Sequence, residues 1–337
     1  MRRRDVLGLL GLAPLLARAQ GRAPGKVYRV GVLETTSLQL NAENFERFRK
    51  GMEERGYVEG PSLVLLYRSA EGRTERFAEL AAELVKLKVD LIVARGTPAA
   101  LAAMKATAAA TASATASASA PIPIVMAAAG DPVESRLVAS LAKPGGNVTG
   151  LTSTTAELVP KRLELLKALV PKMTRVAAYA NLGNVAAANT WKETEIAARA
   201  MGLEAVLLDV REPAQIAPAF DAAVRQRAEA LIVGVETLAQ SNRKEIVALA
   251  AKYRLPAVYS AREFVEAGGL MSYGVSYADL YYRAAGYADR ILKGAAPGAL
   301  PVERPAKFAF AINRGAAKAL GIAIPPDLLL RADWSIG

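Results

Sequence analysis

The chain contains no cysteine and no histidine among its 337 residues. It can therefore form neither a disulfide nor a thiolate nucleophile, and it lacks the usual general base and the commonest metal ligand of proteins. These absences exclude a Ser-His-Asp triad and an HExxH zinc site, and we expect neither a metal nor a cofactor. Aromatic residues make up only 6%, so few are available for the stacking that sugar receptors use.

The chain carries a formal net charge of +11, a value that nucleic-acid-binding proteins share. Its basic residues are scattered along the expected helices and alternate with acidic residues. They do not form one stripe with interleaved aromatic residues. This distribution is typical of solvated helix faces, and we expect no nucleic-acid partner.

The first 19 residues have the pattern of a signal peptide. Arginines at 2–4 precede an apolar run over 7–16, which is too short to span a bilayer as a mature helix. Ala17-Arg18-Ala19 then predicts cleavage before Gln20. The two arginines Arg3-Arg4 also resemble a twin-arginine export motif. Without a lipobox cysteine or another long apolar segment, we expect a soluble protein in the periplasm or outside the cell.

Residues 131–151 mark a boundary between two similar halves of the chain. Apolar residues repeat at helical spacing over 133–141, and Pro144-Gly145-Gly146 ends the expected helix. Residues 147–150 then begin a second series of strands and helices.

Each half alternates short apolar strands with amphipathic helices. Strands are expected over 27–33, 63–67, 90–94 and 123–127 in the first half, and over 175–180, 204–208, 230–234 and 256–259 in the second. This alternation predicts parallel sheets with right-handed crossovers. The fold class is therefore α/β, with two doubly wound lobes and a cleft between them. A low-complexity Ala/Thr/Ser tract over 106–120 has no apolar face and is expected to be a flexible surface loop.

Several stretches resemble, in order, a family of ABC-transporter substrate-binding proteins with the type 1 periplasmic-binding fold, which includes receptors for tryptophan and phenylalanine. They are RGYVEG at 55–60, the segment 131–150, KRLELLK at 161–167, REFVEAGGLMSYG at 262–274 and IPP at 324–326. The resemblance runs from about residue 27 to the C-terminus. It implies a three-segment hinge, with a return to the first lobe at 269–274. Lobe 1 would comprise 27–147 plus 269–296, and lobe 2 would comprise 150–262 plus 299–337.

Ligands of open α/β sheets bind outside the carboxyl ends of the strands, which selects the loops there. The candidate ligand-binding residues are Thr35, Thr36, Thr97, Ala129, Gly130, Asn181, Glu236 and Arg262. Their hydroxyls and backbone N–H groups suit a carboxylate. Glu236 is the best acidic candidate for an ammonium group, and Arg262 could clamp a carboxylate with two hydrogen bonds.

Each candidate also has a purely structural interpretation. The threonines could cap helices, Asn181 could only form a turn, and Arg262 could be a solvated surface arginine. Asp131 is better explained as a helix cap, which leaves the backbone of Ala129 and Gly130 as ligand contacts.

The sequence favours a monomeric extracytoplasmic receptor that closes around a small solute and presents it to an ABC permease. An amino acid or a related small carboxylate is the favoured solute. A ligand-sensing module of a membrane signalling receptor is the alternative. An enzyme is less favoured, because no GxGxxG follows the first strand and there is no P-loop.

Overall fold

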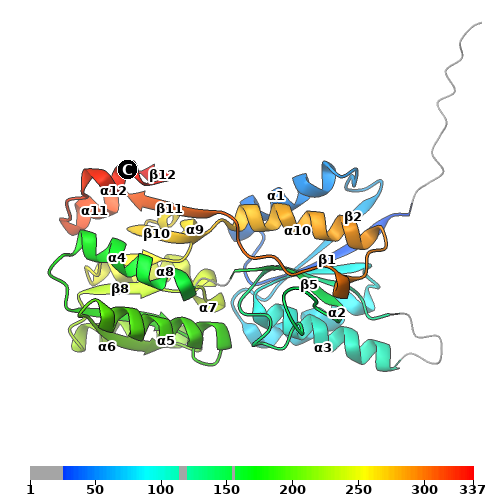
Figure 1. Cartoon of the computed structure of the whole chain (residues 1–337), viewed down its shortest axis with the longest axis horizontal. Coiled ribbons are helices and arrows are strands. Elements are labelled where there is room, and N and C mark those ends of the chain that lie inside the picture. The colour runs from blue at the N-terminus through cyan, green and yellow to red at the C-terminus, as the bar shows by residue number, and fades with distance from the viewer. Residues whose placement is uncertain (1–25, 114–119, 154–155) are drawn as a thin grey trace, which may run out of the picture.

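The computed structural model describes residues 26–113, 120–153 and 156–337. The predicted signal peptide, 1–19, lies outside the described residues, as does the middle of the Ala/Thr/Ser tract. Two α/β lobes lie side by side along the long axis of the molecule (Figure 1). The predicted fold class is confirmed. In the described part of the chain, no helix is long and apolar enough to cross a membrane.

The first lobe is built on a five-stranded parallel sheet in the order β2-β1-β3-β4-β5. The strands are β1 (Tyr28–Glu34), β2 (Leu63–Ser69), β3 (Leu91–Arg95), β4 (Ile124–Ala129) and β5 (Val148–Thr152). One face is covered by α1 (Ala42–Glu53) and α10 (Tyr277–Leu292), and the other by α2 (Phe77–Lys86) and α3 (Thr97–Ser113) (Figure 1). Every residue of β3 and β4 is buried, as a sheet covered on both faces requires.

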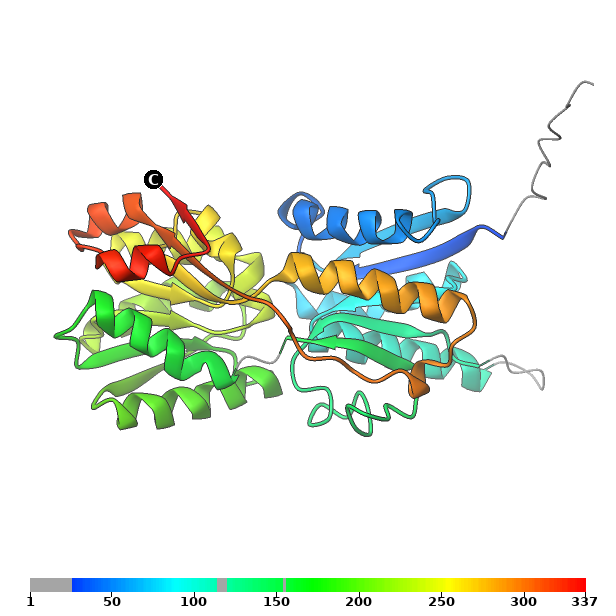
Figure 2. The same ribbon diagram turned by 45° about the horizontal axis from the view of Figure 1, so that its top comes forward.

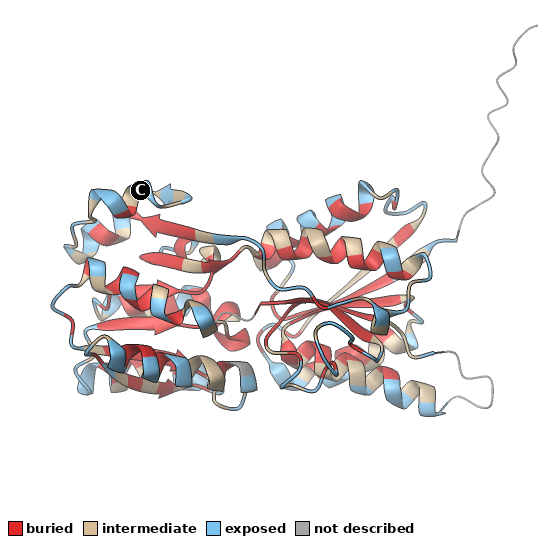
Figure 3. Ribbon diagram, in the orientation of Figure 1, coloured by how far each residue is buried: buried red, intermediate tan, exposed pale blue. Residues whose placement is uncertain are grey.

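The second lobe has a seven-stranded sheet in the order β12-β11-β10-β9-β8-β6-β7. Its strands are β6 (Arg175–Ala180), β7 (Glu204–Asp209), β8 (Ala230–Val233), β9 (Ala257–Tyr259), β10 (Met271–Val275), β11 (Phe308–Asn313) and β12 (Trp334–Ile336). Only the β10–β11 pair is antiparallel among the pairs described. Buried strands run between the helices of both lobes (Figure 3).

Helices cover both faces of the second sheet. They are α4 (Val159–Leu169), α5 (Val185–Ala200), α6 (Ile216–Arg225), α7 (Thr237–Ser241), α8 (Arg243–Lys252), α9 (Arg262–Glu266), α11 (Arg314–Leu320) and α12 (Pro326–Leu330). Leu163 of α4 and Ala198 of α5 belong to one core with Ile232 of β8. Phe220 of α6 and Ile246 of α8 belong to another core with Leu231. Successive side chains of β8 point to opposite faces of the sheet, so this strand contributes to the cores on both faces.

The chain passes between the lobes at places that differ from the expected boundaries (Figure 2). Strand β5 pairs with β4, so the first lobe extends through Thr152 rather than ending at 147. Strand β10 pairs with β9 and therefore belongs to the second lobe. The expected return to the first lobe at 269–274 is wrong, because the chain returns there only after Val275. Glu303 still bonds to the backbone of β5, so the last crossing lies after it rather than before 299.

The expected helix over 133–141 is not formed. The Asp131 carboxylate accepts hydrogen bonds from the amides of Val133 (3.0 Å) and Glu134 (2.9 Å). This local bonding competes with a helix. Arg136 then adopts a positive φ of 56°, which ends the turn. Leu137 is nevertheless buried. The spacing of the apolar residues therefore predicted their burial correctly but not a helix.

The Ala/Thr/Ser tract is not a loop over its first part, because α3 continues to Ser113. Alanine has the highest helix propensity, and Thr107 anchors the extension by accepting a hydrogen bond from the Asn147 amide at 3.1 Å. Thr107 is buried although the tract has no apolar stripe. The expected loop is therefore wrong over 106–113, and its remainder at 114–119 lies outside the described residues.

Candidate functional site

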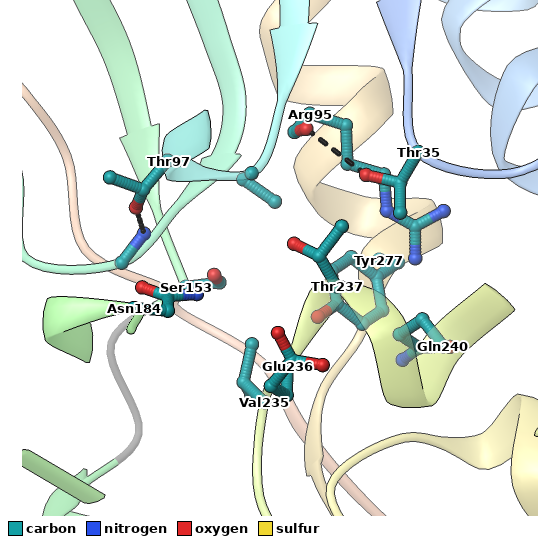
Figure 4. A pocket seen from close by; sticks show the side chains of 13 residues that line it. Thr35, Arg95, Thr97, Ser153, Asn184, Val235, Glu236, Thr237, Gln240 and Tyr277 are labelled. Atoms are coloured by element: carbon teal, nitrogen blue, oxygen red, sulfur yellow. Dashed lines mark hydrogen bonds between the residues drawn. The ribbon is translucent and has the colours of Figure 1, made fainter. Parts of the chain in front are cut away.

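A cavity lies between the two lobes at the carboxyl ends of their parallel strands (Figure 4). It encloses about 410 Å³ of space between atoms, part of which is continuous with solvent. Its walls are formed by Thr35, Arg95, Gly96, Thr97, Ala128, Gly130, Ser153, Asn184, Val235, Glu236, Thr237, Gln240 and Tyr277. Ligand sites commonly lie in such concave places between domains, where a few polar groups converge, so this cavity is the candidate solute site.

The loops that follow β3 and β4 form one wall. Gly96 has a φ of +85°, a conformation that glycine adopts readily, and it turns the chain from β3 into α3. Its amide donates to the carbonyl of Ala128 at 2.7 Å, and the Gly130 amide donates to the Thr97 hydroxyl at 3.0 Å (Figure 4). The Gly130 amide, which was expected to be free for a carboxylate, is thus bonded within the lobe.

A buried charge cluster stands at the end of β1 and β3. Arg95 donates to Asn41 Oδ1 at 2.8 Å, lies 4.0 Å from Glu34, and stacks over the Tyr277 ring at 4.4 Å. Burial raises the pKa of Glu34, although Arg95 and the hydroxyl of Tyr281, which donates to Glu34 Oε1, oppose the shift. Burial lowers the pKa of Arg95, but Tyr281, Glu34 and Tyr277 raise it overall. The positive charge of Arg95 is therefore already balanced.

Glu236 reaches the cavity from the second lobe, three residues after the end of β8 (Figure 4). Its carboxylate caps α7 by accepting from the Ala239 amide at 2.9 Å, and it lies 3.5 Å from the Asn181 amide nitrogen. The side chain is only 2% exposed. Burial raises its pKa to about 7, against the opposing effect of these hydrogen bonds. None of the salt bridges in the described part of the chain involves Glu236, and no cation is among the largest influences on its pKa.

The raised pKa of Glu236 predicts how stability depends on pH. Its pKa rises from 4.5 to about 7 on folding, so the folded protein holds this proton more tightly than the unfolded chain. The contribution is complete below about pH 4.5 and is lost as pH rises through 7, on the order of 3 kcal/mol in total. Urea unfolding of the wild type and of Glu236→Gln between pH 4.5 and 8 should show this loss in the wild type alone. Equal slopes of the unfolding free energy against pH in the two proteins would contradict this prediction.

Four of the eight predicted residues line the cavity: Thr35, Thr97, Gly130 and Glu236. The other four, Thr36, Ala129, Asn181 and Arg262, do not line it. The buried hydroxyl of Thr36 has no partner among the described residues, and Ala128 lines the wall in place of Ala129. Asn181 lies behind Glu236, and Asn184 lines the cavity instead.

Arg262 is not in the cavity wall and is not positioned to clamp a carboxylate there. It forms salt bridges with Glu43 at 2.5 Å and with Glu266 at 2.8 Å. Glu43 belongs to α1 in the first lobe, so this arginine joins the lobes outside the cavity. Its charge is satisfied by these two acids.

The sequence-based selection missed Arg95, Ser153, Thr237, Gln240 and Tyr277. Arg95 was recognisable, because it is a charged residue that ends the apolar run LIVAR. Tyr277 was hidden by the misplaced return to the first lobe at 269–274. No pattern in the sequence distinguishes Ser153 or Gln240.

Polar contacts hold the lobes together around the cavity. Ser241 Oγ donates to the carbonyl of Thr35 at 3.2 Å, and Arg243 Nη2 donates to the carbonyl of Leu40 at 2.9 Å. Asn189 donates to the Glu134 carboxylate across the lobes. The lobes thus stand in a closed arrangement.

Comparisons with known proteins agree with these features. A family model described as ABC transporter substrate binding protein matches residues 29–336. A protein of Clostridioides difficile (strain R20291) named "Tyrosine-binding protein" is 30% identical over 273 residues, which are 81% of this chain and 75% of that protein. The crystal structure of an ABC domain from Streptococcus pneumoniae in complex with L-Trp is 27% identical, with a TM-score of 0.82 over 92% of this chain and 100% of the other.

A second solved structure is described as open. It is the ligand-free, open form of a Clostridium difficile substrate-binding protein with adhesive properties, 25% identical over 91% of this chain and 99% of that one. Its TM-score is 0.64, although identity and coverage nearly equal those of the L-Trp complex. The present chain as a whole is therefore more similar in structure to the L-Trp complex than to the open protein.

Proposed function

The chain belongs to the ABC transporter substrate-binding protein family, and on this premise we propose that it receives a free amino acid outside the cytoplasm and delivers it to an ABC permease. In this proposal residues 1–19 direct export, the mature protein acts as a monomer, and the two lobes close around the solute. No chemical conversion is required of it, because closure and release suffice for delivery.

The observation that carries the amino-acid proposal is the buried carboxylate of Glu236. A buried carboxylate without a cationic partner is costly, and an ammonium group of the solute would remove that cost. Asn181 supports Glu236 from behind by donating toward Oε1. The named ligands of two relatives, tyrosine and L-Trp, both carry such an ammonium group.

The first lobe would add neutral hydrogen-bond partners. The hydroxyls of Thr35 and Thr97 line the opposite wall and can bond polar atoms of the solute. Gly130 would shape this wall, because its amide is bonded to Thr97 and its carbonyl to Thr152. We assign Thr36 and Ala129 to the support of this wall, since neither lines it. Arg262 would act as a lock between the closed lobes through Glu43.

A screen of the twenty L-amino acids by thermal unfolding tests this function. At about 100 times its Kd, the preferred amino acid should stabilise the protein by about 2.7 kcal/mol and raise the Tm by roughly 5 °C. Small-angle scattering should show a smaller radius of gyration with that amino acid, because the lobes close. Stabilisation by a sugar or a simple dicarboxylate, with no response to any amino acid, would contradict the proposed solute class.

A further inference from the structure

Three arginines are buried among the described residues: Arg95, Arg162 and Arg243. Arg95 has Glu34 at 4.0 Å, and Glu263 and Glu266 both raise the pKa of Arg243 against the effect of burial. Arg162 differs from both. The groups that oppose the burial of its charge are two tyrosines, and no carboxylate is among them.

Arg162 lies in the first turns of α4 and has no solvent-accessible surface. Its Nε donates to the carbonyl of Tyr273 at 2.7 Å, which fixes the plane of the guanidinium. Nη1 and Nη2 have no hydrogen-bond partner in the described part of the chain. Burial lowers the pKa of Arg162 to about 10. A buried guanidinium with two unpaired nitrogens is strongly unfavourable unless an anion meets it.

The place of Arg162 connects it with the cavity. Tyr273 is in β10, two residues before that strand ends and the chain crosses to the first lobe. Tyr277, just beyond the crossing, lines the cavity and is one of the two tyrosines whose interaction with Arg162 raises the pKa of that guanidinium. Arg162 does not line the closed cavity, so an anion from the cavity would reach it past the Tyr277 side chain.

We propose that Arg162 binds the carboxylate of the solute through Nη1 and Nη2. The inference rests on the proposed amino-acid function and deepens it. Glu236 and Arg162 are buried groups of opposite charge, and neither has a charged partner among the described residues. Together they match a zwitterion, whose ammonium and carboxylate groups would satisfy one each. The planar guanidinium suits this role because it can bond both oxygens of a carboxylate.

The test compares amino acids with their carboxamides, which lack the carboxylate. The pairs are L-tyrosine and L-tyrosinamide, L-tryptophan and L-tryptophanamide, and L-leucine and L-leucinamide, measured by titration calorimetry. For any pair whose amino acid binds, the wild type should bind the amino acid at least tenfold more tightly than its carboxamide. Arg162→Met should bind the two within about twofold, and Arg162→Lys should fall between. Lys161→Met, the exposed neighbouring position, should keep the wild-type ratio.

A second measurement separates solute binding from a role in folding. Arg162→Met should unfold at the same or a higher temperature than the wild type without solute, because it removes an unpaired buried charge. If Arg162→Met keeps the wild-type preference for acids, or if the wild type binds amides as well as acids, the proposal is overturned while amino-acid binding stands. Should Arg162→Met not fold, Arg162→Gln replaces it.

A thermal unfolding experiment with acetate tests the carboxylate site even if the protein does not bind amino acids. At equal ionic strength, sodium acetate should raise the Tm of the solute-free wild type more than sodium chloride does, and this difference should vanish in Arg162→Met. Equal effects of acetate and chloride on the wild type would overturn a carboxylate site. A response to acetate without binding of any amino acid would support Arg162 and contradict the proposed function.

Discussion

Replacing Glu236 by glutamine should lower the affinity for the preferred amino acid at least 100-fold at pH 8, a loss of about 2.7 kcal/mol. At that pH the wild-type carboxylate is ionised, because its pKa is about 7. Glutamine has nearly the same shape and can still accept from the Ala239 amide, so α7 should keep its cap. The variant loses only the charge that would pair with the solute ammonium.

Calorimetry at pH 8 on Glu236→Gln and on Glu195→Gln checks this prediction. Glu195 is an exposed residue of α5 in the same lobe, so the control makes the same chemical change away from the cavity. The control should bind like the wild type. Unchanged affinity in Glu236→Gln would show that the ammonium group binds elsewhere.

Substituting Gly274 by alanine should destabilise the protein by at least about 3 kcal/mol and disturb lobe closure. A Cβ at this position would lie 1.7 Å from the backbone oxygen of Ser260. Ser260 cannot easily retreat, because it is fully buried and its hydroxyl donates to the carbonyl of Gly234 at 2.9 Å. The ends of β8, β9 and β10 are thus joined at a point that leaves no room for a methyl group.

Gly146→Ala is the matched control for this substitution. Gly146 does not need a positive φ, and a Cβ there would meet no atom within 4 Å. Chemical unfolding should show a large loss for Gly274→Ala and little change for Gly146→Ala. If Gly274→Ala unfolds like the wild type, the strand ends must be able to separate, and the close packing at Ser260 is not a constraint.

The architecture was predictable because the two lobes repeat a simple pattern of apolar strand and amphipathic helix. The placement of β10 was not, because its apolar residues would suit a buried strand in either sheet. Its pairing with β9 on one side and β11 on the other assigns it to the second lobe. The helix expected over 133–141 failed for a different reason, since the Asp131 side chain bonds locally to the backbone that a helix would use.

The candidate site was predictable where a single strand end supplies the residue. Thr97 lies two residues after β3 and Glu236 three residues after β8, so the rule for parallel sheets finds them. Tyr277 and Arg162 depend on how separate segments meet at the crossings between lobes. The sequence KRLELLK alone predicts an ordinary amphipathic helix. Only the packing of the lobe shows that Arg162 is buried and has no acidic residue beside it.

The position of Tyr277 has a consequence for the rate at which a solute leaves. This residue belongs to a helix of the first lobe, yet it lies only two positions after Val275, the last residue of strand β10 in the second lobe. Separation of the lobes therefore removes one wall of the cavity in the same movement. Residence time is then governed by the lifetime of the closed state. Under the proposed function, a permease that draws the lobes apart would release the solute in one step rather than by breaking its contacts one at a time.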